Sequence, residues 1–172
     1  FEDTINCPDG TSQVTKAKYW NDLSNTPDYF NACSIIWEAS VPENFAGYQD
    51  AHTGVAYMGM YCYSTVQLYR EIIGANLLTP LTIGQKYYVN LKACMGYRQF
   101  GANTTAATNK LGVLLTTQNF TSNPPPINNY SQVYFDSIVI DSINWVTLRG
   151  SFIADSAYTH ICIGNFFDDA HT

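Results

Sequence analysis

The acidic side chains are the first candidates for chemistry, and their spacing argues against catalysis. Hydrolysis of a glycosidic bond needs two carboxyl groups about 5–10 Å apart, one of them with a raised pKa. Glu38, Glu43 and Glu71 each stand alone in the sequence. Asp168 and Asp169 are neighbours, but adjacent side chains of a strand point to opposite faces. The sequence therefore predicts no glycoside hydrolase site.

Nucleophilic catalysis finds no better support. The chain contains no GxSxG segment, which would place a serine on a sharp turn between strand and helix. None of the three histidines, at 52, 160 and 171, stands beside a serine or cysteine in a known catalytic motif. His160 lies in an apolar run and is expected to be a hydrogen-bonded structural residue. These absences predict a protein that is not an enzyme.

Aromatic and polar side chains, in contrast, suit the binding of sugars. Aromatic rings stack on the C–H faces of pyranose rings, and Asn, Asp, Arg and Glu side chains bond their hydroxyls. Tyr61 and Tyr63 alternate within one predicted strand, and Arg70 lies in the next, so a concave sheet would present all three. Further candidates come from predicted loops and from the C-terminal end: Tyr97, Arg98, Phe100, Asn109, Asp168 and Asp169.

A structural reading of the same residues stays open. Aromatic residues make up 15% of the chain, so most rings are expected to be core. Arg70 and Glu71 would then form an ordinary surface pair, which contributes little to stability.

The five cysteines bear on the cellular compartment. Cys7 and Cys33 lie in loop-like segments rich in Asn, Pro and Asp, whereas Cys62, Cys94 and Cys162 lie in apolar stretches. No CxxC pair or metal-ligand spacing is present, which argues against zinc. We predict a Cys7–Cys33 disulfide in an oxidising exterior, with five buried free thiols as the alternative.

Composition excludes several partners. The net charge of -6 and pI near 4.7 leave no basic patch to neutralise phosphates, so nucleic acid is not expected as a partner. No apolar run approaches the roughly 18 residues that cross a bilayer, so no membrane insertion is expected. Because the chain opens on Phe1, we expect a mature secreted or cell-surface protein whose signal has been removed.

Short strands are the elements that would position these side chains. Seven runs carry strand signals with turn residues between them: 55–63, 67–73, 85–94, 110–117, 134–140, 145–154 and 159–166. The run at 85–94 alternates apolar and polar residues, as a half-buried strand does. A short turn of helix is expected at 17–23. The prediction is one all-β domain over 1–172, a sandwich of two antiparallel sheets.

Segments spread over most of the chain resemble one known family. They are, in order, the FED opening at 1–3 with Trp20, HTGVAYMGM at 52–60, LTPLTIGQKYYVNLKA at 78–93 and NWVTLRGSFIAD at 144–155. Together they resemble calcium-containing jelly-roll carbohydrate-binding modules of the galactose-binding-like fold. CPDG with TPDYFNAC, YREIIGANL and IGNFFDDAHT are similar to uncharacterised surface proteins of Bacteroidetes-type bacteria.

The resemblance implies a structural calcium site. In that family the ligands are the opening glutamate, loop carbonyls before the second segment, and an aspartate of a final Y-I-D-D-V strand. Glu2 and the loop from Asp50 to Gly54 match the first two positions, whereas no such strand precedes Thr172. The expected jelly roll therefore lacks its last strand. Calcium takes about 6–8 oxygens, and a solvent-exposed Glu2 is the alternative.

Two classes of function remain. In the first, the chain is a non-catalytic module that binds polysaccharide or another glycan at the cell surface. In the second, it is a structural or adhesion subunit whose jelly roll packs against other surface proteins. A sandwich without its last strand favours the second class somewhat, because it leaves an edge that another strand can fill.

Overall fold

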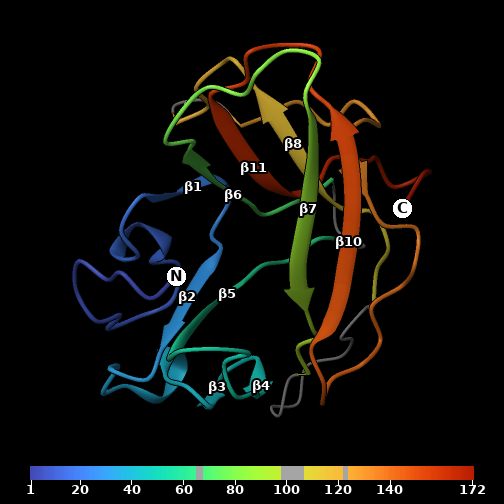
Figure 1. Ribbon diagram of the computed structural model, residues 1–172. Coiled ribbons are helices and arrows are strands. Elements are labelled where there is room, and N and C mark those ends of the chain that lie inside the picture. Colours follow the sequence, from blue (N-terminus) through green and yellow to red (C-terminus); the bar gives the residue numbers. More distant parts are fainter. Residues whose placement is uncertain (65–67, 98–106, 122–123) are drawn as a thin grey trace.

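The structure is a computed structural model, and it describes residues 1–64, 68–97, 107–121 and 124–172 (Figure 1). The described strands are β1 (Trp20–Ser24), β2 (Asp28–Asn31), β3 (Glu43–Asn44), β4 (Gly47–Tyr48), β5 (Ala56–Gly59), β6 (Ile72–Asn76), β7 (Lys86–Ala93), β8 (Leu111–Thr116), β9 (Val133–Tyr134), β10 (Val146–Ile153) and β11 (His160–Asn165). Two 3-10 helices, η1 (Val14–Lys16) and η2 (Trp37–Ala39), complete the elements. Within these ranges no helix has the length and apolarity to cross a membrane.

One layer is a five-stranded antiparallel sheet in the order β1-β6-β11-β8-β9. The β7–β10 pair packs against it as the second layer, and β2–β5 and β3–β4 form two further antiparallel pairs. The all-β sandwich predicted from the sequence is therefore confirmed.

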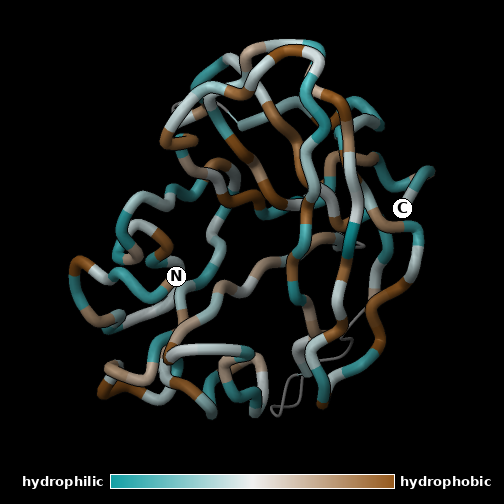
Figure 2. Tube along the Cα trace, in the orientation of Figure 1, coloured by the Kyte–Doolittle hydropathy of each residue, from teal (hydrophilic) through white to brown (hydrophobic). Residues whose placement is uncertain are grey.

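The main core lies between the five-stranded sheet and β7–β10. Val113 and Leu115 of β8 are buried there, with Ile161 and Ile163 of β11 packed beside them. Figure 2 shows the hydrophobic residues concentrated along β8 and β11. The alternation expected for 85–94 is present: the inward residues of β7 pack on this core, whereas Tyr88 is 77% exposed.

Sequence patterns located the strands best where both layers meet. β7, β8, β10 and β11 each lie within one residue of the predicted ends. The strand expected at 67–73 is displaced, since β6 spans Ile72–Asn76. The strand expected at 55–63 ends at Gly59.

Two other expectations were wrong. The segment 17–23 contains no helical turn: η1 ends at Lys16 and β1 begins at Trp20. Tyr19 between them has a φ of 74°, which interrupts a right-handed helix. In the segment 134–140 only Tyr134 belongs to a strand, the two-residue β9, and Ile138 is exposed, so this apolar run is not a core strand.

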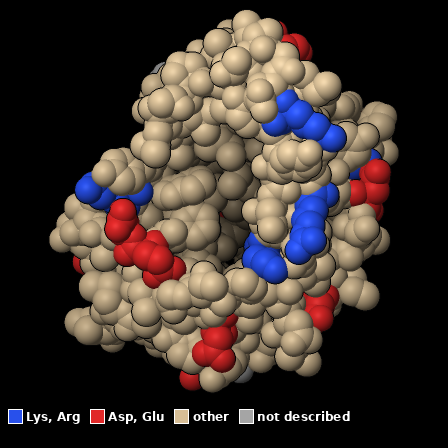
Figure 3. All heavy atoms as spheres, viewed as in Figure 1, with Lys and Arg blue, Asp and Glu red and all other residues tan. Residues whose placement is uncertain are grey.

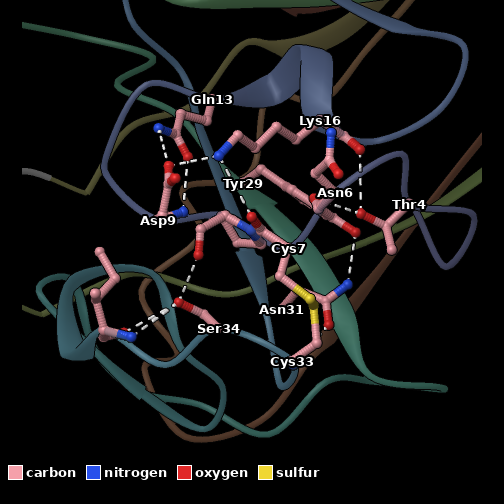
Figure 4. Close-up of a disulfide and its surroundings, with 12 residues drawn as sticks. Thr4, Asn6, Cys7, Asp9, Gln13, Lys16, Tyr29, Asn31, Cys33 and Ser34 are labelled. Atoms are coloured by element: carbon pink, nitrogen blue, oxygen red, sulfur yellow. Dashed lines mark hydrogen bonds and ion pairs between the residues drawn. A yellow bond between two sulfur atoms is a disulfide. The ribbon is translucent and has the colours of Figure 1, made fainter.

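The predicted Cys7–Cys33 disulfide is confirmed. It ties the N-terminal loop to the segment that follows β2 (Figure 4). Ser34 Oγ donates a hydrogen bond to the Pro8 carbonyl at 2.8 Å, and Tyr29 Oη donates to the Phe1 carbonyl at 3.0 Å. The loop is therefore fixed against β2 at several points.

In the described part of the chain, the β2–β5 pair is not hydrogen-bonded to the β7–β10 pair that forms the second layer. β5 pairs with β2, and β7 pairs with β10, but no described strand pairs with the other edge of β5 or β7. Figure 3 shows a hollow between these two pairs on the face in view. Ile161 and Ile163 on the central strand β11 are only half-buried, so the two layers do not close completely.

Candidate functional site

An open pocket beside β2 is lined by two buried acidic side chains, Asp28 and Glu71. Its volume is about 340 Å³, within the range of small-molecule sites. Two acidic residues, three serine or threonine residues and two aromatic residues line it: Asp28, Glu71, Thr11, Ser12, Thr26, Phe45 and Tyr61.

Glu71 forms the fixed part of this pocket. Its side chain is 1% exposed, and three donors point at its two oxygens. Tyr69 Oη donates to Oε1 at 3.0 Å and Thr26 Oγ1 donates to the same oxygen at 3.1 Å. The backbone N–H of Tyr61 donates to Oε2 at 2.7 Å. These donors satisfy both oxygens of the buried side chain and fix its position.

Asp28 is the less satisfied carboxylate. It is 6% exposed, and its Oδ1 accepts a hydrogen bond from the Ser12 backbone N–H at 2.7 Å. No described residue donates a hydrogen bond to its second oxygen, Oδ2. Burial raises the pKa of Asp28 to about 6, the Ser12 N–H opposes that rise, and the charge of Glu71 adds to it.

The N-terminal loop supplies one wall of the pocket. Thr11 and Ser12 lie in this loop, and the disulfide fixes its base to the chain that follows β2. Gln13 and Lys16 both bond Asp9, which holds the loop in a compact shape (Figure 4). The position of the Ser12 N–H opposite Asp28 therefore depends on contacts made elsewhere in the loop.

Two aromatic rings form the apolar wall. Tyr61 is 50% exposed and packs edge to face against Tyr69, with ring centroids 6.5 Å apart. Phe45 packs against the buried Phe30 of β2 at 5.6 Å. The pocket thus offers flat rings beside hydrogen-bond acceptors.

Of the residues predicted to bind a ligand, Tyr61 lines the pocket and Arg70 does not. The expectation of Arg70 on an exposed face was wrong, because it is 1% exposed. Its guanidinium donates to the Phe167 carbonyl at 3.1 and 3.3 Å and to Asp169 at 2.8 Å. It also lies 5.2 Å from the ring centroid of Tyr63, which packs against Arg70 rather than beside Tyr61.

The C-terminal candidates form a separate cluster. Asp169 pairs with Arg70, and Asp168 accepts hydrogen bonds from Asn129 at 2.9 Å and from the backbone of His171 at 3.1 Å. The Asn129 amide and the His171 ring lower the pKa of Asp168. These interactions anchor the C-terminal segment, and neither Asp168 nor Asp169 lines the pocket.

The remaining loop candidates are apart from the pocket as well. Tyr97 is 37% exposed and lies against Gly47, whose φ of 133° brings its backbone close to the Tyr97 ring. Asn109 is half-buried, and its Oδ1 has no hydrogen-bond partner among the described residues. Arg98 and Phe100 lie outside the described residues.

Glu2 lies at the loop that the resemblance assigns to calcium. Its Oε2 accepts the Val55 N–H at 2.8 Å, and its carboxyl group packs over Gly54, where the φ of 69° suits glycine. The Asp50 carbonyl instead accepts a hydrogen bond from the Trp145 indole at 2.8 Å. The described part of the chain holds no group of three or more His, Cys, Asp or Glu side chains placed to bind a metal.

No sequence pattern pointed to the pairing of Asp28 with Glu71. Glu71 is an isolated acidic residue in the sequence, and glutamate is almost never fully buried unless it is paired, so its residue type is no signal for burial. Asp28 follows Pro27 at the start of a strand, where a solvent-exposed turn residue is the ordinary expectation. No protein family, curated protein or solved structure matches this chain.

Proposed function

We propose that this chain is a non-catalytic extracellular module that binds carbohydrate at the cell surface through the pocket of Asp28 and Glu71. The observation that carries the proposal is the presence of carboxylates, hydroxyls and aromatic rings in one pocket of about 340 Å³. Sugars present both C–H faces, which stack on rings, and hydroxyl groups, which donate to carboxylates.

The hydrogen bonds of Glu71 support binding without catalysis. A glycosidase needs two carboxyl groups free to act on the substrate. Three donors already occupy the oxygens of Glu71, which leaves Asp28 with the one carboxylate oxygen lacking a described partner. We therefore expect no new reducing ends when the protein is incubated with an oligosaccharide that it binds. Release of reducing ends that disappears in Asp28→Asn would contradict this part of the proposal.

An extracellular location is supported by the disulfide. Disulfides persist in oxidising compartments and are rare in the cytosol.

The free thiols give no support for catalysis. Burial raises the pKa values of Cys62, Cys94 and Cys162 to about 12, 11 and 12, so these thiols are poor nucleophiles.

A glycan array tests the binding proposal. We expect a restricted set of glycans to bind the wild type, with at least a tenfold weaker signal for Tyr61→Ala. Tyr88→Ala is the matched control, because it removes an exposed ring from β7, which is not part of the pocket lining. Binding of the wild type to no glycan would overturn the function. Equal loss of binding in Tyr61→Ala and Tyr88→Ala would overturn the site.

Calcium belongs to the same proposal as a structural ion. Carboxylate and carbonyl oxygens are the ligands that Ca²⁺ takes, and Glu2 already lies against the loop that contains Gly54. We expect Ca²⁺ to raise the thermal unfolding temperature of the wild type, and Glu2→Gln to remove most of that rise. An unchanged melting temperature at millimolar Ca²⁺ would contradict a calcium site.

The hollow between the β2–β5 and β7–β10 pairs favours a second candidate, a structural subunit that packs against partner chains. β5 and β7 each present one edge without a described partner across the hollow of Figure 3. Such edges accept an extended strand from another chain. We take a second copy of this chain as the partner.

Hydrogen exchange at increasing protein concentration tests this candidate. Association through these edges predicts slower exchange in peptides that cover β5 and β7, together with a larger mass in light scattering. Peptides of β8, which is paired on both sides, are the internal control. A monomer at all concentrations with unchanged exchange would exclude self-association.

A further inference from the structure

We propose that the pocket of Asp28 and Glu71 selects ligands that carry an ammonium group, and that its carbohydrate is an amine-bearing sugar. This inference rests on the proposed function, since it names the ligand class of the same pocket. It goes further because neutral sugars and amine-bearing sugars have similar shapes and differ in charge.

The charge of the pocket is the first argument. Two carboxylates line it, and among the residues that the structure describes the lining includes no lysine, arginine or histidine. The cation nearest in sequence, Arg70, bonds the Phe167 carbonyl and Asp169 instead. Two buried carboxylates without a cation are unfavourable, so a ligand that brings a positive charge gains their attraction.

The geometry at Asp28 is the second argument. Asp28 is only 6% exposed. Among the described residues, the Ser12 N–H alone donates a hydrogen bond to its side chain. An ammonium group has three N–H donors and no acceptor, which suits a carboxylate oxygen without a donor. A neutral hydroxyl can also donate to this oxygen, but only an ammonium group adds the attraction between opposite charges to the hydrogen bond.

The aromatic wall distinguishes an organic cation from a metal ion. Tyr61 and Phe45 line the same pocket, and the faces of such rings attract ammonium groups that lie within about 6 Å. A calcium ion instead needs about 6–8 oxygens, and rings supply none. The mixed lining therefore favours an organic ammonium group.

The test compares sugars that differ only at the amine. Glucosamine oligomers, N-acetylglucosamine oligomers and glucose oligomers of equal length are titrated by calorimetry into the disulfide-intact protein at about pH 7. The variants are Asp28→Asn, and Asp22→Asn as a control that removes one exposed carboxylate of β1. Benzylammonium chloride serves as a probe without a sugar, and CaCl₂ as a metal control.

We expect the glucosamine oligomer to bind at least tenfold more tightly than the other two. Asp28→Asn should reduce that preference to threefold or less, whereas Asp22→Asn should leave it unchanged. Asparagine can still accept the Ser12 N–H, and circular dichroism verifies that each variant is folded. Tyr61→Ala, which changes an exposed ring, is the second variant, and it should weaken binding of benzylammonium and the glucosamine oligomer alike.

The failures of the two proposals can be told apart. Equal or tighter binding of the neutral oligomers, lost in Tyr61→Ala, overturns the ammonium inference and supports carbohydrate binding. Binding of benzylammonium but of no sugar, lost in Asp28→Asn, supports the ammonium site and overturns the carbohydrate proposal. Binding of Ca²⁺ that Asp28→Asn abolishes, or of none of these probes, overturns the inference.

Discussion

Replacing Asp28 with asparagine should stabilise the protein at neutral pH but not in acid. Burial raises the pKa of Asp28 from its ordinary value of 3.8 to about 6, so the folded protein binds this proton more tightly than the unfolded chain. The folded state therefore loses stability as the pH rises through this window. The rise in pKa corresponds to about 3 kcal/mol, because one pKa unit equals about 1.4 kcal/mol.

Urea unfolding of wild type and Asp28→Asn at pH 4 and pH 8 measures this effect. The free energy of unfolding of Asp28→Asn, relative to wild type, should be about 2–3 kcal/mol greater at pH 8 than at pH 4. The difference between these two pH values is smaller than the full value of about 3 kcal/mol, because the aspartate of the unfolded chain is already partly ionised at pH 4. Other titrating groups contribute to both proteins and cancel in the difference.

Asp22→Asn is the matched control, since Asp22 is exposed and the net charge changes equally. Its relative stability should stay constant within about 0.5 kcal/mol between the two pH values. A constant relative stability for Asp28→Asn as well would refute the reasoning, because Asp28 would then be as well solvated in the folded protein as in the unfolded chain.

Two further predictions concern the supports of the site. The Cys7→Ser/Cys33→Ser variant should lose about 3 kcal/mol of stability in urea unfolding, because the disulfide joins residues 26 apart in sequence. It should also bind glycan more weakly, and a reductant should have no further effect on it. Arg70→Met should cost about 3 kcal/mol, because the Phe167 carbonyl loses its buried donors. Asp169→Asn, which changes the exposed partner, should cost under about 1 kcal/mol in the same assay.

Much of the second layer could be predicted from the sequence, because its signal is local. In β7, Tyr87, Val89 and Leu91 face the core and alternate with polar residues, a pattern that follows from the strand period alone. β1 was missed because Trp20–Ser24 carries polar residues and a register shift between Asp22 and Ser24. Its place at the sheet edge depends on pairing with β6, which no local pattern reveals.

The candidate site was largely beyond sequence reasoning for the same reason. Asp28 and Glu71 are far apart along the chain and meet only in the fold, and Ser12 reaches Asp28 from a third segment. Tyr61 was predicted from its residue type, whereas Arg70 was assigned to a surface by the same argument. Arg70 and Glu71 are neighbours in sequence, but Arg70 bonds Asp169 whereas Glu71 accepts the Tyr61 N–H in the pocket. This difference depends on the segments that pack around them, which are distant in sequence.

A nuclear magnetic resonance titration with the glucosamine oligomer tests the central claim most directly, because it locates the bound ligand. We expect the largest chemical-shift changes on the amides of Ser12, Asp28 and Tyr61, with little change on β7 and β10. Shifts that are absent at millimolar ligand, or that gather on the outer face of β7–β10, would contradict the assignment of this pocket as the binding site.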